Sequence, residues 1–125
     1  MSESDRRNNT MLLPCPDSPN CVSSQSRDAE HFVEPFRYEG SQSHARERLL
    51  SVLRSMGGAN VVESSPTYVR AEFTSAVFRF VDDVEFYFPG DATVIHVRSA
   101  SRVGYYDFGA NRKRVERIRS LLEGK

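Results

Sequence analysis

Residues 68–99 read YVRAEFTSAVFRFVDDVEFYFPGDATVIHVRS, and apolar and polar side chains alternate along most of this stretch. Successive side chains of a β-strand point to opposite faces, so a period of two predicts strands that are buried on one face. Thr74-Ser75 and Pro89-Gly90-Asp91 are turn signals that divide the stretch into antiparallel strands. The expected apolar face carries Val69, Ala71, Phe73, Ala76, Phe78, Phe80, Val84, Phe86, Phe88, Ile95 and Val97.

The last hairpin can be placed in register from its side chains. If the apolar residues of both strands face the core, Glu85 lies opposite His96, and Asp83 lies opposite Arg98; both are favourable cross-strand pairs. A slip of one residue would bury these charges. Two arrangements remain open for Asp82-Asp83: a tight hairpin turn, or part of one long bent strand. The expected cross-strand pairs on the core face are Phe88–Thr93, Phe86–Ile95 and Val84–Val97.

Two segments have helical spacing of their apolar residues. Ser41 can cap a helix over residues 42–56, because its hydroxyl can accept from an amide of the first turn, and Gly57-Gly58 can end that helix. A second helix is expected over residues 108–122, with Asp107 as its N-cap. The expected buried stripes are Ala45, Leu49, Val52, Leu53 and Met56 in the first helix, and Phe108, Val115, Ile118 and Leu122 in the second.

The chain has 125 residues, which is enough for one domain. Residues 1–12 are polar and without a period, and we expect them to be disordered. We expect residues 13–125 to form a single α+β domain: an N-terminal extended arm with a short strand at Phe32-Val33, then an antiparallel meander sheet of four or five strands with two helices packed on one face. No stretch is apolar enough to span a membrane and no secretory signal is visible, so we expect a cytoplasmic protein; an exported or organellar mature form is the alternative.

The two cysteines, Cys15 and Cys21, flank a short loop rich in proline. A disulfide between them is one interpretation, and it would stabilise the fold by about 2 kcal/mol. Free thiols in a reducing cytosol are the other. Their spacing is longer than in the usual zinc-binding pairs and no second pair of ligands follows, so we expect no metal and no cofactor.

Several segments, taken together, resemble the signature of a known family in order and spacing. They are PCP at 14–16, NCVSS at 20–24, FVDDVE at 80–85 and RSASRVG at 98–104, continued by Asp107, Gly109 and Asn111-Arg112. In these features the chain resembles the family called domain of unknown function 1499 (DUF1499), over nearly its whole length. The resemblance implies a compact domain and implies no activity.

The segment rich in arginine and serine is the main candidate site. Guanidinium groups, hydroxyls and the amides of a helix N-terminus are the ingredients of an anion site. The candidate ligand-binding residues are Arg98, Ser99, Ser101, Arg102, Asn111 and Arg112. The other interpretation is a structural network, because buried charges have to be paired. This network would contain Asp82, Asp83, Arg98, Arg102 and Asp107, with Arg98 facing Asp83 and Arg102 reaching Asp82 or Asp107.

We therefore expect a non-enzymatic binding or accessory domain that recognises an anionic small molecule or a protein partner. The alternative is an enzyme that uses His96, Asp83 and Glu85 on the polar face of the sheet, where His96 beside Glu85 has the form of an oriented base. The 17 basic and 17 acidic residues balance, and no aromatic and basic residues interleave, so we expect no nucleic-acid partner.

Overall fold

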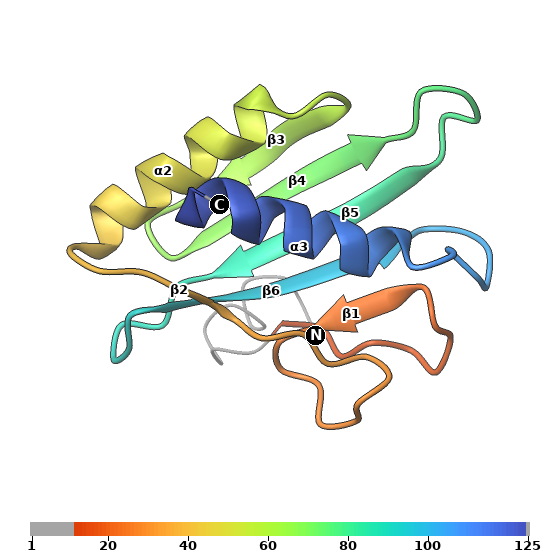
Figure 1. Ribbon diagram of the computed structural model, residues 1–125, viewed down its shortest axis with the longest axis horizontal. Helices are drawn as coiled ribbons and strands as arrows, with labels where there is room; N and C mark the ends of the chain where they lie inside the picture. Colours follow the sequence, from red (N-terminus) through yellow and green to blue (C-terminus); the bar gives the residue numbers. More distant parts are fainter. Residues whose placement is uncertain (1–11, 125) are drawn as a thin grey trace.

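The computed structural model describes residues 12–124. In chain order its elements are β1 (Cys21–Ser23), β2 (Phe36–Arg37), α2 (Gln42–Ser55), β3 (Ala59–Ser64), β4 (Tyr68–Thr74), β5 (Val81–Tyr87), β6 (Val94–Ser101) and α3 (Ala110–Glu123). The strands form an antiparallel sheet in the order β1-β6-β5-β4-β3, and β2 also pairs with β6 (Figure 1). The predicted α+β class is confirmed, and the arm adds β1 and β2 to the predicted meander.

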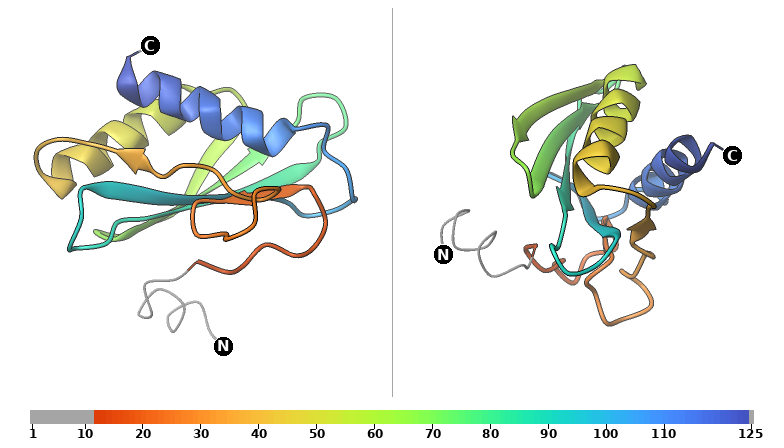
Figure 2. Two further views of the ribbon diagram at one scale, coloured as in Figure 1. Left: turned by 60° about the horizontal axis from the view of Figure 1, so that its bottom comes forward. Right: turned by 90° about the vertical axis from the view of Figure 1, so that its left-hand side faces the viewer.

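Both helices cover the same face of the sheet, as predicted (Figure 2). Strand alternation turns Val69, Phe86 and Val97 toward the helices, where they pack in one core with Leu49 of α2 and Ile118 of α3. Burying a side chain of this size stabilises a fold by about 1.5–3 kcal/mol. Within residues 12–124, no helix is long and apolar enough to cross a membrane.

The register of the β5–β6 hairpin differs by two residues from the predicted one. Glu85, rather than Asp83, lies opposite Arg98, and His96 lies opposite Tyr87. A shift of two residues leaves every side chain on its own face, so the alternating pattern is satisfied equally by both registers. Both registers place a carboxylate opposite the Arg98 guanidinium, Asp83 in the predicted one and Glu85 in the observed one, so the charges do not decide between them either.

The connection between β5 and β6 is longer than the predicted turn because both of its ends pair elsewhere. Phe88 N donates to Thr67 O at 2.9 Å, and Tyr38 N donates to Thr93 O at 3.2 Å. The second bond joins the arm to the start of β6. Contacts with distant parts of the chain therefore help to set the hairpin register. These contacts cannot be predicted from the sequence of the hairpin alone.

The predicted strand over Ala76, Phe78 and Phe80 is wrong, because residues 75–80 form the β4–β5 loop. Ser75 N donates to Phe80 O at 2.9 Å and Phe80 N donates to the Ser75 hydroxyl at 3.0 Å, which closes the loop on itself. Phe78 is 73% exposed instead of lying in the core. Asp82-Asp83 neither closes a hairpin nor sits in a long bent strand, since β5 begins at Val81.

The N-terminal arm is held by pairing rather than only laid over the body. β1 pairs with β6 from Cys21 opposite Ala100, and Phe36 of β2 lies opposite Ile95. At the predicted strand Phe32-Val33 there is only an isolated bridge from Ser23 to Phe32. Residues 1–11 of the segment expected to be disordered lie outside the described residues. The twelfth, Leu12, is buried against Tyr68 and Tyr87.

The starts of the two helices match the sequence to different degrees. The Ser41 hydroxyl accepts from His44 N at 3.1 Å, which confirms the predicted cap of α2. Helix α3 begins at Ala110, later than predicted. Phe108 therefore precedes the helix and is 90% exposed, so its predicted place in the buried stripe is wrong. Asn111 occupies the first buried position of α3 instead.

Candidate functional site

Strand alternation separates the residues that the sequence groups into one ligand site. Ser99 and Ser101 of β6 face α3, and both contact Asn111. Arg98 and Arg102 instead contact acidic residues on the outer face, which is the face of the sheet away from the helices. The six candidate residues are therefore divided between two sides of the sheet.

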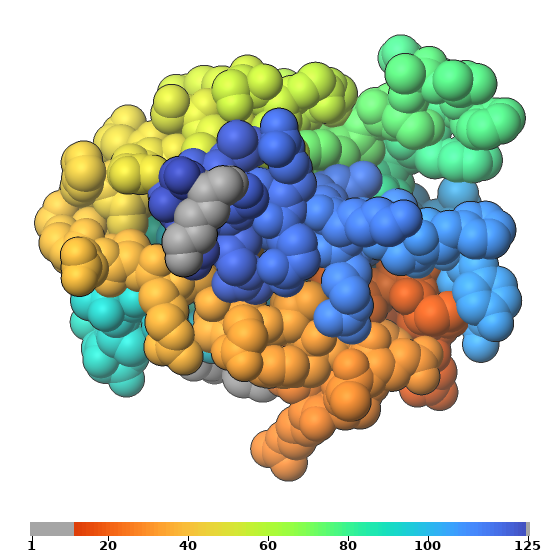
Figure 3. Space-filling model, in the orientation of Figure 1, coloured from red at the N-terminus to blue at the C-terminus, as the bar shows by residue number. Residues whose placement is uncertain are grey.

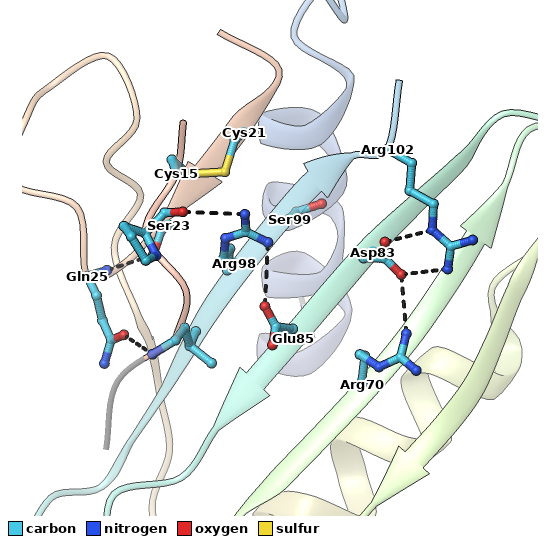
Figure 4. Close-up of polar contacts among 12 residues, drawn as sticks. Cys15, Cys21, Ser23, Gln25, Arg70, Asp83, Glu85, Arg98, Ser99 and Arg102 are labelled. Atoms are coloured by element: carbon cyan, nitrogen blue, oxygen red, sulfur yellow. Dashed lines mark hydrogen bonds and ion pairs between the residues drawn. A yellow bond between two sulfur atoms is a disulfide. The ribbon is translucent and has the colours of Figure 1, made fainter. Parts of the chain in front are cut away.

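On the outer face, Arg102 holds Asp83 in a bidentate ion pair (Figure 4). Arg102 Nε lies 2.8 Å from Asp83 Oδ2, and Arg102 Nη2 lies 2.9 Å from Asp83 Oδ1. The same guanidinium lies 2.6 Å from Glu72, and Arg70 adds a contact of 3.3 Å to Asp83. The Arg102 guanidinium is the main cause that holds the pKa of Asp83 below its ordinary value. Asp83 thus pairs with Arg102 rather than with the predicted Arg98.

Glu85 is a buried carboxylate on the same face, with 3% of its surface exposed. It accepts a hydrogen bond of 2.5 Å from the Tyr68 hydroxyl, and Arg98 Nη1 lies 3.5 Å from its other oxygen. A buried charge is tolerated when it is both paired and hydrogen-bonded. Glu85 thus takes the place that the sequence assigned to Asp83 as the partner of Arg98.

On the helix side, Asn111 connects α3 to the last strand and to the arm. The Ser99 hydroxyl donates to Asn111 Oδ1 at 2.6 Å. The Asn111 amide nitrogen lies 2.9 Å from Ser101 Oγ and 3.1 Å from the carbonyl oxygen of Asn20. Asn111 thus contacts both serine side chains and the arm, and all of these partners belong to the fold.

Arg114 is a central residue of this side. It forms an ion pair of 2.7 Å with Asp82, and its guanidinium lies 4.9 Å from the centre of the Phe73 ring. It also donates to Asn111 Oδ1 at 2.8 Å. Asp82 therefore pairs with a residue of α3, and not with the predicted Arg102.

The N-terminus of α3 is closed by the chain itself. Asp107 Oδ1 accepts from Gly109 N at 2.9 Å, and Asp107 Oδ2 accepts from Asn111 N at 3.0 Å. Burial raises the pKa of Asp107, but these amides outweigh it and leave the pKa below its ordinary value. Arg112 points elsewhere and donates to the backbone oxygens of Phe32 and Glu30 at 2.8 and 2.9 Å. The helix N-terminus thus already holds a carboxylate.

The residues of the enzyme hypothesis are each held by a different neighbour. His96 Nδ1 lies 3.0 Å from the hydroxyl of Ser24, which itself accepts from Val97 N at 2.8 Å. Burial lowers the pKa of His96 below its ordinary value of 6.5, which favours a neutral ring at pH 7. Glu85 and Asp83 have the partners described above. His96 has no carboxylate partner among residues 12–124, so the predicted oriented base is not formed there.

An open groove lies between the end of α2, the β4–β5 loop and α3, with a volume of about 1120 Å³. Its lining contains no carboxylate and four cationic side chains, which are Arg79, Lys113, Arg114 and Arg117. Within residues 12–124, no ion pair or hydrogen bond engages the charged groups of Arg79, Lys113 and Arg117. We call this feature the basic groove.

The other basic residues of α3 are used to hold the fold. Arg119 donates to the carbonyl oxygens of Glu34 and Pro35 at 2.7 and 3.1 Å, and its guanidinium lies 4.9 Å from the centre of the Phe36 ring. Arg112 similarly binds the arm, as described above. The positive charge of α3 that remains available is therefore concentrated in the basic groove.

The fold and these polar contacts extend over the segments in which the sequence resembles a known family. The model of the family described as "Protein of unknown function (DUF1499)" matches residues 11–122. The chain belongs to this family. No curated protein matches the sequence of this DUF1499 domain.

The main polar residues that the sequence analysis missed in this DUF1499 domain are Tyr68, Arg114 and Arg79. Arg114 lies three residues after Asn111 and directly before Val115, so helical spacing places it at the border of the buried stripe. That helical spacing could have identified Arg114 as a partly buried polar residue. No comparable signal marked Arg79, because the alternation around it predicted a strand.

Proposed function

We propose that this DUF1499 domain binds an anionic small molecule in the basic groove. The observation that carries the proposal is a lining without any carboxylate, in which three cationic side chains have no partner among residues 12–124. Like charges that face one cleft raise the local concentration of counter-ions. The expected ligand carries phosphate or carboxylate groups, because guanidinium groups bind these oxyanions with paired hydrogen bonds.

The arrangement of the cations supports binding from two sides. Lys113 and Arg117 lie four residues apart on α3, and this spacing puts them on one face of the helix. Arg79 comes from the opposite wall, which is the β4–β5 loop. An anion that enters the groove can therefore be approached by a guanidinium from each wall.

One cation of the α3 wall is already engaged by the fold. Arg114 is held there by its ion pair with Asp82 and by the Phe73 ring, so it cannot follow a ligand freely. The positive potential therefore rests on the three other cations.

The arginine- and serine-rich segment is not part of this proposal. Arg102 and Arg112 are engaged with acidic side chains and with backbone oxygens of the fold. Ser99 and Asn111 are buried. Binding of a protein partner through this segment would require those contacts to open.

The test is calorimetric titration, together with thermal melts, using inorganic phosphate and pyrophosphate as probes. We expect pyrophosphate to bind and to raise the melting temperature, because a ligand that binds the folded state stabilises it. Arg117→Ala should weaken the affinity by about tenfold or more, since it removes a charge-assisted contact. The affinity should also fall as salt is added.

The matched control is Arg27→Ala, which removes an exposed arginine that does not line the groove. This variant should bind pyrophosphate as the parent does. The proposal fails if neither probe binds the parent, or if Arg27→Ala and Arg117→Ala weaken binding equally.

A further inference from the structure

Nine large apolar side chains are exposed among residues 12–124, and seven of them lie in two loops. One is the β4–β5 loop, and the other is the β6–α3 loop over residues 102–109. Exposed apolar residues scattered singly are normal, whereas a concentrated group marks an interaction surface. We call the five aromatic members the aromatic tip: Phe78, Phe80, Tyr105, Tyr106 and Phe108.

The two loops project from the same end of the molecule (Figures 1 and 3). Their bases are joined, because Arg102 N donates to Val81 O at 3.2 Å. Within each loop the rings pack on one another. The ring centres of Phe78 and Phe80 lie 5.7 Å apart, and those of Tyr105 and Tyr106 lie 5.1 Å apart. The rings thus gain contact with each other while remaining open to solvent.

The exposure of Phe108 is imposed by the backbone around it. Phe108 has a left-handed conformation with φ 55°, which costs free energy for a residue other than glycine. Asp107 on one side is fixed to the amides of Gly109 and Asn111. The chain therefore turns this ring outward from a fixed position, and 90% of the residue is accessible.

The charge near the aromatic tip is mainly positive, although Glu30 of the arm lines a hollow together with Tyr106 and Phe108. The β4–β5 loop contains Arg79 and no acidic residue. In the other loop the single carboxylate, Asp107, is occupied by backbone amides, and Lys113 follows on the adjacent turn of α3. A partner at this end would therefore meet aromatic rings with Arg79 and Lys113 on the side of the basic groove.

We propose that the aromatic tip docks on an anionic phospholipid bilayer. The rings would lie in the interfacial region, where Phe and Tyr side chains are favoured, with Arg79 and Lys113 beside headgroup phosphates. Two projecting loops that carry exposed aromatic rings beside mainly positive charge suit a deformable anionic surface better than a protein, which would need a site of complementary shape. This proposal goes beyond the basic groove, which requires only a dissolved anion.

The test is co-sedimentation of the full chain with vesicles of phosphatidylcholine alone, and of phosphatidylcholine mixed with phosphatidylglycerol. We expect binding to the mixed vesicles only, weakening as salt is added. The double variant Phe78→Ser/Phe108→Ser should bind the mixed vesicles at least about tenfold more weakly. The variant lacks two apolar side chains whose transfer from water into the bilayer interface stabilises the bound state. Both residues are exposed, so the variant should melt as the parent does.

The matched control is Leu13→Ser/Val62→Ser, which removes two exposed apolar side chains outside the tip and should bind vesicles normally. The proposal is overturned if the parent ignores anionic vesicles, binds neutral ones equally, or binds as well without Phe78 and Phe108. Titration with pyrophosphate separates this outcome from the other proposal. The tip variant should bind pyrophosphate as the parent does, whereas Arg117→Ala should bind it more weakly.

Discussion

Among single residues, Glu85 depends most on its neighbours, because its carboxylate is almost completely removed from water. Arg98, whose side chain is only 12% exposed, supplies the opposite charge. Arg98→Ala would remove the guanidinium that faces this buried carboxylate. Breaking a buried ion pair in this way should cost about 3 kcal/mol or more in the free energy of unfolding. Chemical denaturation of the parent and the variant measures this difference.

Two further measurements sharpen that prediction. Arg27→Ala removes an exposed arginine and should leave the free energy of unfolding nearly unchanged. Added phosphate should not restore the stability lost in Arg98→Ala, since Arg98 does not line the basic groove. A loss below about 1 kcal/mol, the size typical of an exposed pair, would show that the Glu85–Arg98 contact is not a buried ion pair.

Asp83 should make the free energy of unfolding depend on pH in the acidic range. Its pKa in the folded protein is held below the ordinary value of 3.8, chiefly by Arg102. The stabilisation is therefore complete above that value and is lost as the pH falls through the lower folded pKa. In melts taken from pH 6 downward, Asp83→Asn should show a shallower loss of stability than the parent.

At the residue scale, the sequence predicted the kinds of interaction better than the partners. The ion pairs of Asp82, Asp83 and Arg102 were expected, but each partner was misassigned. Partner choice depends on which face a residue occupies and on a register that alternation leaves open by two residues. The sequence pattern therefore identifies the charges that need pairing, and only the assembled sheet determines their pairing.

Among the elements, the end of α2 offers a matched pair of glycines. Gly58 has φ +81°, and a Cβ atom there would lie 2.6 Å from Thr74 O. Gly57 has open space around it. Gly58→Ala should lower the free energy of unfolding by about 1 kcal/mol or more, because an L side chain is strained in this conformation. Gly57→Ala should be neutral or slightly stabilising. Equal effects in thermal melts would contradict this account.

The elements whose signals are local were predicted best. Ser41 and Gly57-Gly58 delimit α2 through short-range chemistry, and the structure agrees within about a residue. The β4–β5 loop was missed because Ala76, Phe78 and Phe80 alternate as a strand does. Alternation reports which residues share a face, but it contains no information about whether that face is covered. The apolar side chains of the β4–β5 loop are not covered by either helix, so Phe78 and Phe80 stay exposed.

For the whole molecule, the disulfide between Cys15 and Cys21 fixes the start of the arm beside β6. The structure joins them, with Cα atoms 5.7 Å apart. Reduction should lower the free energy of unfolding by about 2 kcal/mol, since the loop that the bond closes is short. Denaturation with and without a reducing agent measures this, with Cys15→Ala/Cys21→Ala as the variant that should not respond. A parent that is insensitive to reduction would contradict the estimate.

The pairing of the arm with β6 also dictates an order of events during synthesis. Cys21 of β1 pairs with Ala100, and Phe36 of β2 pairs with Ile95. Both strands are therefore synthesised long before the strand with which they pair. Helix α2 and the hairpins that follow it can form from contacts between near neighbours. Closing the long loops that bring the arm to β6 is slow, because the entropy of closure is lost before the contacts form. The arm is therefore expected to dock last, and until then the edge of β6 that it covers can pair with other nascent chains.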